Sequence, residues 1–173
     1  MLIGLVGKKS SGKDTFGNIL INQYGFKKRA FADPLKDCCE LLFNLSKEQL
    51  NDENLKETID VNWQMTPREI MQKVGTDLFR NHFNKDFWLL LFKQWYLKNS
   101  NHNIICTDVR FQNEADLIKN LGGIIIKIDR HNNNIDSHES ECLNINFYDY
   151  IIYNHDSLEN YISNINSLIN III

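Results

Sequence analysis

The chain has 173 residues, of which 43% are hydrophobic and 24% charged, and its formal net charge at pH 7 is -3. A chain of this length can bury a core, and its slight negative charge excludes the broad basic field that non-specific nucleic-acid binding needs. The longest apolar runs, such as residues 87–92, are too short to cross a bilayer, and no secretory leader is visible. We therefore expect one cytoplasmic domain, residues 1–173, that binds neither nucleic acid nor membrane.

A glycine-framed turn follows the first predicted strand, residues 2–7. The segment from Gly7 to Thr15 matches G-x-x-x-x-G-K-[ST] except at its last position, where Asp14 stands and Thr15 comes one place later. Such a loop wraps an anion with its backbone N–H groups, the next helix adds its positive dipole end, and Lys13 reaches the outer phosphates. We expect Mg²⁺ near Asp14, with a helix-dipole role as the alternative. The predicted ATP-binding residues are Ser10, Ser11, Gly12, Lys13, Asp14 and Thr15.

The middle of the chain is predicted to be mostly helical. Residues 29–32 are a candidate strand, Ser46 can cap a short helix, and a capping box with proline at its first position predicts a helix over residues 66–82. Polar residues recur along that helix at four-residue spacing, which indicates a distinct polar or solvated face. Gly75 inside it suggests close approach of a ligand base or a neighbouring helix. The apolar helix 86–98, with Trp88, Phe92 and Trp95, fits either core or an interface.

Apolar runs at 103–107, 124–128 and 150–153 alternate with helical patterns, and Asp156-Ser157-Leu158-Glu159 opens a last helix. This alternation predicts parallel strands with crossover helices, in which ligands bind outside the carboxyl ends of the strands. The residues at those ends are Gly7 to Thr15, Asp33, Asp108 to Glu114, and Arg130. Asp108 can hold Mg²⁺ and Arg110 can bind phosphate. A structural ion pair among Asp108, Arg110 and Glu114 is the alternative.

Positive side chains are more numerous at these positions than ATP binding alone requires. Phosphoryl transfer needs cations around both donor and acceptor, so the pattern favours a kinase with an anionic acceptor. For Lys36 and Arg130 an ordinary surface charge is the alternative. The cations are Lys9, Lys13, Lys36, Arg68, Arg110 and Arg130.

Six motifs together carry a family resemblance. They are the segments 7–15, Phe-Ala-Asp-Pro-Leu-Lys at 31–36, Arg-Glu-Ile-Met-Gln-Lys-Val-Gly-Thr-Asp at 68–77, Asp-Val-Arg-Phe-Gln-Asn-Glu at 108–114, Ser-His-Glu-Ser-Glu at 137–141 and Tyr-Asn-His-Asp-Ser-Leu-Glu at 153–159. In order and spacing the chain resembles the deoxynucleoside monophosphate kinases of large DNA viruses and bacteriophages. The Gly-Lys-Asp-Thr form of the loop is characteristic of that group, although Phe16 stands where the phage forms carry a hydroxyl.

The resemblance implies a P-loop NTPase fold, a three-layer α/β/α arrangement with a central parallel sheet. It also implies an NMP-binding region at about 34–82 and a lid at about 130–145. The implied reaction is transfer of the γ-phosphoryl group of ATP to a deoxynucleoside 5′-monophosphate with Mg²⁺, and a homodimer is suggested. The implied catalytic residues are Lys9, Lys13, Arg68, Arg110 and Arg130, and the implied metal ligands are Asp14, Thr15 and Asp108. The implied substrate ligands are Lys9, Asp33, Lys36, Trp63, Arg68, Gln72, Thr76, Asp108, Arg110, Glu114, His138 and Glu141.

Two other functions stay open at this point. Animal phosphomevalonate kinases also resemble the Gly-Lys-Asp loop, and a nucleotide-sensing module would bind ATP without transferring phosphate. The accepted bases depend on a few pocket contacts and do not follow from the residues.

Overall fold

The computed structural model describes residues 1–130 and 145–173, and these divide into two compact units. Unit 1 comprises residues 1–30 and 96–173, and unit 2 comprises residues 31–95. The predicted NMP-binding region falls within unit 2, whereas almost all of the predicted lid lies outside the described residues. The assignment of both units to one kinase domain stays a prediction.

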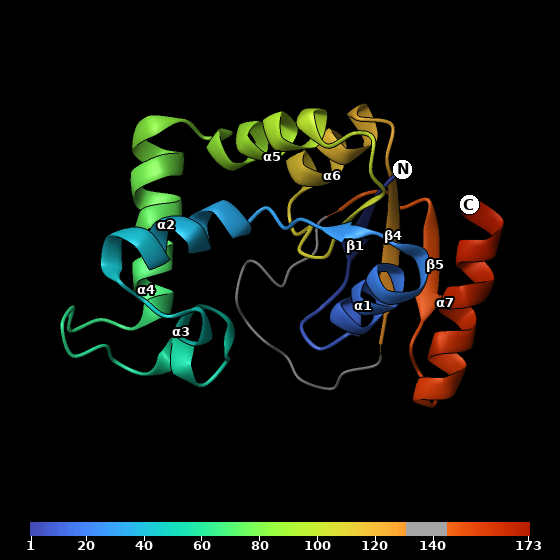
Figure 1. The fold of residues 1–173 in the computed structure, drawn as a ribbon, viewed down its shortest axis with the longest axis horizontal. Coiled ribbons are helices and arrows are strands. Elements are labelled where there is room, and N and C mark those ends of the chain that lie inside the picture. Colours follow the sequence, from blue (N-terminus) through green and yellow to red (C-terminus); the bar gives the residue numbers. More distant parts are fainter. Residues whose placement is uncertain (131–144) are drawn as a thin grey trace. The chain divides into compact units, whose positions relative to one another are not determined.

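Unit 1 is built on a five-stranded parallel sheet with the order β2-β3-β1-β4-β5. Figure 1 labels β1, β4 and β5 of this sheet. The central strand β1 places Ile3 opposite both Ile105 and Ile124. The elements are β1 (Leu2–Val6), α1 (Lys13–Tyr24), β2 (Lys27–Lys28), β3 (Ile104–Cys106), α6 (Gln112–Asn120), β4 (Ile124–Asp129), β5 (Tyr150–Tyr153) and α7 (Leu158–Ile172). Four of the predicted strands are thus confirmed to within two residues of their ends.

The predicted strand at residues 29–32 is wrong, because the edge strand β2 lies just before it. Lys27 and Lys28 form the strand, and the N–H of Arg29 adds one hydrogen bond to the carbonyl of Ile105 before the chain turns. Ala30 and Phe31 are buried, but Phe31 owes this to stacking on Phe92, with ring centroids 4.3 Å apart. Apolar character by itself does not separate a buried turn from a strand.

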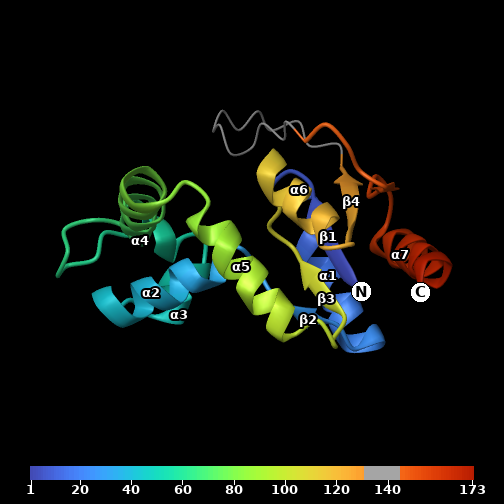
Figure 2. The ribbon, with the colours of Figure 1, turned by 90° about the horizontal axis from the view of Figure 1, so that it is seen from above.

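Helices cover both faces of the sheet. Successive side chains of β1 point to opposite faces, so each face needs helices to bury its apolar side chains. Ile3 and Leu5 belong to the core cluster that α1 and α7 contribute to. Gly4, between them, faces the other way, since a Cβ there would lie 2.6 Å from Cδ1 of Ile118 on α6. Figure 2 shows α6 and α7 on opposite sides of the strands. The predicted three-layer α/β/α fold is confirmed.

Unit 2 is helical apart from its connecting turns, and α5 continues beyond it. Its elements are α2 (Asp33–Phe43), α3 (Lys47–Asn51), the 3₁₀ turn η1 (Leu55–Glu57), α4 (Pro67–Gln72), the π-helix η2 (Lys73–Phe83) and α5 (Phe87–Lys98). The helix cap predicted at Ser46 and the capping box predicted at Thr66 are both confirmed, and the cap at Ser46 is also a capping box. Cys39, Leu45, Leu50, Ile70 and Val74 form one buried core cluster of the unit.

The predicted helix 66–82 is present but changes its hydrogen bonding part-way. From Lys73 onwards it is a π-helix, a form that is rare and found mostly at single turns. Gly75 lies in this part, where a Cβ would come 2.8 Å from Cδ2 of Leu35, and its carbonyl accepts a 2.9 Å hydrogen bond from the indole N–H of Trp88. Packing, the second of the two reasons offered for Gly75, is therefore confirmed, and Trp88 is core.

Within residues 1–130 and 145–173, no helix combines the length and the apolar character that crossing a membrane requires.

Candidate phosphate-transfer site

The phosphate loop is a tight turn that requires glycine at two positions, Gly7 and Gly12, for different reasons. Ser10 and Gly12 have φ values of 59° and 110°, and the N–H of Ser11 donates to the carbonyl of Lys8 at 3.2 Å. A Cβ on Gly7 would lie 2.5 Å from Ser11 Oγ and 2.8 Å from the carbonyl oxygen of Ile128. Both glycines are thus required by space or conformation, and the loop leads directly into α1.

The side chain of Lys13 folds back over the start of the loop. Its Nζ donates to the carbonyls of Gly7 and Lys8, both at 2.6 Å. An ammonium group held at a loop whose N–H groups and helix N-terminus favour anions is suited to bind the outer phosphates of a nucleotide.

Ser11 has a different place from that expected of a ligand side chain. The residue is 1% exposed, and its buried hydroxyl has no hydrogen-bond partner among the described residues. The backbone of Ser11 is therefore the better candidate for a contact to ATP than its buried hydroxyl.

Asp14 forms an ion pair with Lys28 of β2, in which the carboxylate and the ammonium are 3.2 Å apart. The carboxylate lies in the first turn of α1, which the helix dipole favours, and 83% of its side chain is exposed. A cation bound by Asp14 would compete with Lys28. The structure thus adds an ion pair to the helix-dipole alternative for this residue.

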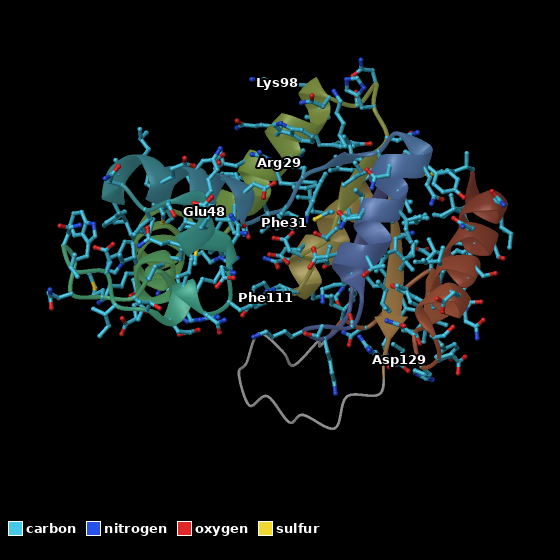
Figure 3. All side chains as sticks on the ribbon, turned by 60° about the horizontal axis from the view of Figure 1, so that its bottom comes forward. Arg29, Phe31, Glu48, Lys98, Phe111 and Asp129 are labelled. Carbon is cyan, nitrogen blue, oxygen red and sulfur yellow. The ribbon has the colours of Figure 1, made fainter. Side chains whose placement is uncertain are left out.

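Side chains from the C-terminal third hold the loop by its carbonyl oxygens. Asn154 Nδ2 donates to the carbonyl of Ser11 at 2.8 Å, and the Tyr161 hydroxyl donates to that of Gly12 at 3.1 Å. Arg130 Nη1 donates to the carbonyl of Ser10 at 3.0 Å. Arg130 follows Asp129, which Figure 3 labels at the carboxyl end of β4. The structure thus places Arg130 at the phosphate loop.

Asn154 and Tyr161 are not among the predicted site residues, although the sequence around each carries a signal. Asn154 comes directly after a strand, at the end of the sheet where ligands were expected. Tyr161 stands four residues before Ile165 in the apolar stripe of α7 and so reads as core. Only the three-dimensional structure shows that its hydroxyl reaches the loop.

The residues after β3 are arranged by a helix cap. Glu114 is 2% exposed and accepts hydrogen bonds from the backbone N–H groups of Arg110 and Phe111, at 2.8 and 3.1 Å. Its carboxylate thus fixes the turn before α6, while the Arg110 residue is exposed. Asp108 accepts a hydrogen bond from the Cys106 thiol at 3.2 Å, and burial, with Asp108 adding its charge, raises the pKa of that thiol.

The predicted substrate ligands of unit 2 lie on several of its helices. Arg68 on α4 pairs with Glu57 and, at 3.7 Å, with Glu53. Lys36 on α2 donates to Asn51 Oδ1 at 2.8 Å. The indole N–H of Trp63 donates to the carbonyl of Phe43 at 2.8 Å, and Trp63 is 40% exposed. Asp33 is the first residue of α2, and Gln72 and Thr76 are exposed on α4 and η2.

Unit 1 therefore brings Ser10 to Thr15 together with Arg130. It also carries Lys9, Asp108, Arg110 and Glu114, whereas unit 2 carries Asp33, Lys36, Trp63, Arg68, Gln72 and Thr76. His138 and Glu141 lie outside the described residues. The ligand roles of all these side chains stay predictions.

The residues present fit ATP and Mg²⁺. A Cβ at Gly7 would collide with Ser11 Oγ and one at Gly12 with Asn154 and Tyr161, so only glycine lets the loop pack this tightly. The backbone N–H groups of such a turn suit phosphate oxygens. In the part of the chain that the structure describes, no group of three His, Cys, Asp or Glu side chains gathers as a metal site. Mg²⁺ in kinases is held through phosphates plus one or two protein oxygens, and Asp14 and Thr15 at the end of the loop offer oxygens of that kind.

Comparison with known proteins decides the family. The family profile described as deoxynucleotide monophosphate kinase matches residues 1–60 and 47–165. This chain belongs to that family. A relative from Acanthamoeba polyphaga mimivirus, assigned to the deoxynucleotide monophosphate kinases, is 43% identical and aligns with 98% of this chain and 96% of its own length. The deoxynucleotide monophosphate kinase of Enterobacteria phage T4 is 27% identical and aligns with 99% of each chain.

Solved structures support the fold of this family member. Shikimate kinase from Aquifex aeolicus superimposes with a TM-score of 0.56 at 15% identity, covering 98% of this chain and 96% of its own. Dephospho-CoA kinase from Campylobacter jejuni gives 0.54 at 16% identity, covering 99% and 96%. At these identities the likeness concerns the fold alone.

Proposed function

We propose that this protein transfers the γ-phosphoryl group of ATP to the 5′-phosphate of a deoxynucleoside monophosphate, yielding a deoxynucleoside diphosphate and ADP. Family membership across nearly the whole chain supports the reaction class. The observation that carries the proposal is the phosphate loop, in which Lys13 and the glycine-framed backbone form an anion cradle at the N-terminus of α1. The same membership disfavours a phosphomevalonate kinase.

In the proposed mechanism an oxygen of the acceptor phosphate attacks the γ-phosphorus, and the bond from that phosphorus to the β,γ-bridging oxygen breaks. The acceptor oxygen is already anionic, so no general base is needed and catalysis is positioning and charge stabilisation. Lys13 and the N–H groups of the loop hold the donor phosphates, while Lys9 neutralises charge between donor and acceptor. Mg²⁺, held near Asp14, Thr15 and Asp108, would supply further neutralisation of the phosphate oxygens.

The acceptor ligands are proposed residue by residue from the family's motifs. Arg110 and Arg130 in unit 1 and Arg68 in unit 2 would bind phosphate, for which the guanidinium fork is suited. Since Arg68 pairs with Glu53 and Glu57, an acceptor phosphate would have to compete with these carboxylates. The further proposed ligands are Asp33, Lys36, Trp63, Gln72, Thr76, Asp108, Glu114, His138 and Glu141. We also propose a cytoplasmic protein that forms a homodimer, which light scattering in solution would test.

A coupled ADP-release assay with ATP, Mg²⁺ and a panel of deoxynucleoside and ribonucleoside monophosphates tests the function. We expect turnover that depends on the base. Lys13→Ala should reduce kcat by about 10²- to 10³-fold, the range for loss of one charge-stabilising donor. Lys27→Ala, which removes an exposed lysine from β2, should leave kcat unchanged. ATP binding without turnover of any monophosphate would instead indicate a nucleotide-sensing module.

A further inference from the structure

Two buried side chains that the mechanism does not use hold the phosphate loop from outside. Asn154 follows β5 and is 8% exposed, and Tyr161 lies on α7 and is 2% exposed. They donate to the carbonyls of Ser11 and Gly12, at 2.8 and 3.1 Å. Consecutive peptide groups of the loop therefore each accept a hydrogen bond from one side chain of the other end of the sequence, and the carbonyl of Gly12 also accepts the N–H of Phe16 at 3.0 Å.

Because the peptide group is planar, these contacts to carbonyl groups also set the direction of the N–H groups of the loop. In a planar trans peptide the C=O and N–H groups point in opposite directions. A carbonyl of Ser11 directed at Asn154 therefore directs the N–H of Gly12 away from Asn154. In the same way, the bond from Tyr161 to the carbonyl of Gly12 directs the N–H of Lys13 away from Tyr161. Both N–H groups lie at the N-terminus of α1, where a bound phosphate accepts hydrogen bonds from backbone N–H groups.

The packing around Gly12 shows how closely the two side chains approach. A Cβ on Gly12 would lie 2.7 Å from Asn154 Nδ2 and 2.9 Å from Tyr161 Cε1. Burial raises the pKa of Tyr161, against an opposing effect of Arg130, so its hydroxyl stays protonated and can donate at all pH values used for assays. With Arg130 on the carbonyl of Ser10, donors reach the carbonyls of residues 10, 11 and 12 in succession.

We infer that Asn154 and Tyr161 are positioning residues, which orient the N–H groups of Gly12 and Lys13 toward the phosphates of the donor nucleotide. The inference rests on one part of the proposed function, namely that the phosphates of ATP bind in the loop. It deepens the function by extending the donor site to the end of β5 and the first turns of α7.

Tyr161→Phe is the main test because it keeps the ring in the core and removes only the hydroxyl. Binding of ATP and of inorganic tripolyphosphate is measured by titration calorimetry, and KM for ATP, KM for the monophosphate and kcat by ADP release. We expect both Kd values and KM for ATP to rise about fivefold, the factor that one neutral hydrogen bond supplies. KM for the monophosphate and kcat should stay within twofold. Asn154→Leu should raise the same three constants about tenfold, since it also leaves a buried carbonyl without its donor.

Tyr24→Phe is the matched control. The Tyr24 hydroxyl donates to Asn166 Oδ1 of α7 at 3.1 Å, so this change removes a hydrogen bond of the same kind between α1 and α7, at the other end of α1. It should lower the thermal midpoint comparably and change no Kd. Wild-type Kd values for ATP and tripolyphosphate in folded Tyr161→Phe would overturn the inference. Failure of the proposed function is a separate outcome, namely ATP binding with no turnover in the wild-type protein.

Discussion

Gly12→Ala is expected to damage both stability and ATP binding. At φ 110° an alanine is strained, which costs about 1–3 kcal/mol. Its Cβ would also lie 2.7 Å from Asn154 Nδ2 and 2.9 Å from Tyr161 Cε1, and forcing a group into so tight a space costs about 1–3 kcal/mol more. The free energy of unfolding should fall by about 2–6 kcal/mol, a large part of the ~5–15 kcal/mol that holds a domain folded.

Gly25→Ala separates strain from crowding. Gly25 also has a positive φ, 69°, but no heavy atom lies within 4 Å of the position its Cβ would take. It should cost about 1–2 kcal/mol through backbone strain alone and leave the Kd for ATP unchanged. Urea denaturation followed by circular dichroism measures both costs, and titration calorimetry measures ATP binding. Equal destabilisation by the two substitutions, with wild-type ATP affinity in Gly12→Ala, would refute the reasoning.

Two further predictions concern stability. Trp88→Phe should destabilise the protein by about 2 kcal/mol, because Trp88 is 4% exposed and its indole N–H donates to the carbonyl of Gly75; an unchanged urea midpoint would contradict this. Desolvation would raise the pKa of Asp149, but hydrogen bonds, first that from Lys119, outweigh it and lower the pKa below its usual value. A lowered folded-state pKa stabilises the fold above the unfolded-state pKa, about 3.9, and this contribution is lost as the pH falls through the folded-state pKa. Asp149→Asn should therefore cost about 1 kcal/mol at pH 7 and progressively less below pH ~4, as urea titrations at several pH values would show; a cost independent of pH would contradict it.

The sheet was predictable because its strands are short apolar runs separated by helical patterns. Strong local signals located β1, β3, β4 and β5, and the caps at Ser46, Thr66 and Ser157 located helix starts. The edge strand β2 was misplaced because its two residues are exposed lysines. They form a strand because they pair with β3, and hydrophobicity does not reveal that pairing. The π-helical part of 66–82 was likewise invisible, since its tertiary contacts come from Leu35 and Trp88.

The phosphate loop was predictable because its function requires fixed residue types at fixed spacing. What the sequence concealed is how single side chains are used. The Ser11 side chain is buried, and the Glu114 carboxylate accepts hydrogen bonds from the backbone before α6; their ligand roles stay predictions. The contacts of these two side chains depend on the direction in which each side chain points, and the residue type does not determine that direction.

The strand order has a consequence for how the chain can fold. β1 precedes the other four strands of the sheet in the sequence, yet it pairs with β3 and β4, which begin about a hundred residues later. Closing such long loops costs entropy before any pairing stabilises them, whereas the helices of unit 2 make contacts nearer in sequence. A nascent or truncated chain that ends before β5 would contain the complete G-x-x-x-x-G-K motif without Asn154 or Tyr161. The loop therefore gains these two hydrogen bonds only after β5 and the first turn of α7 have been added.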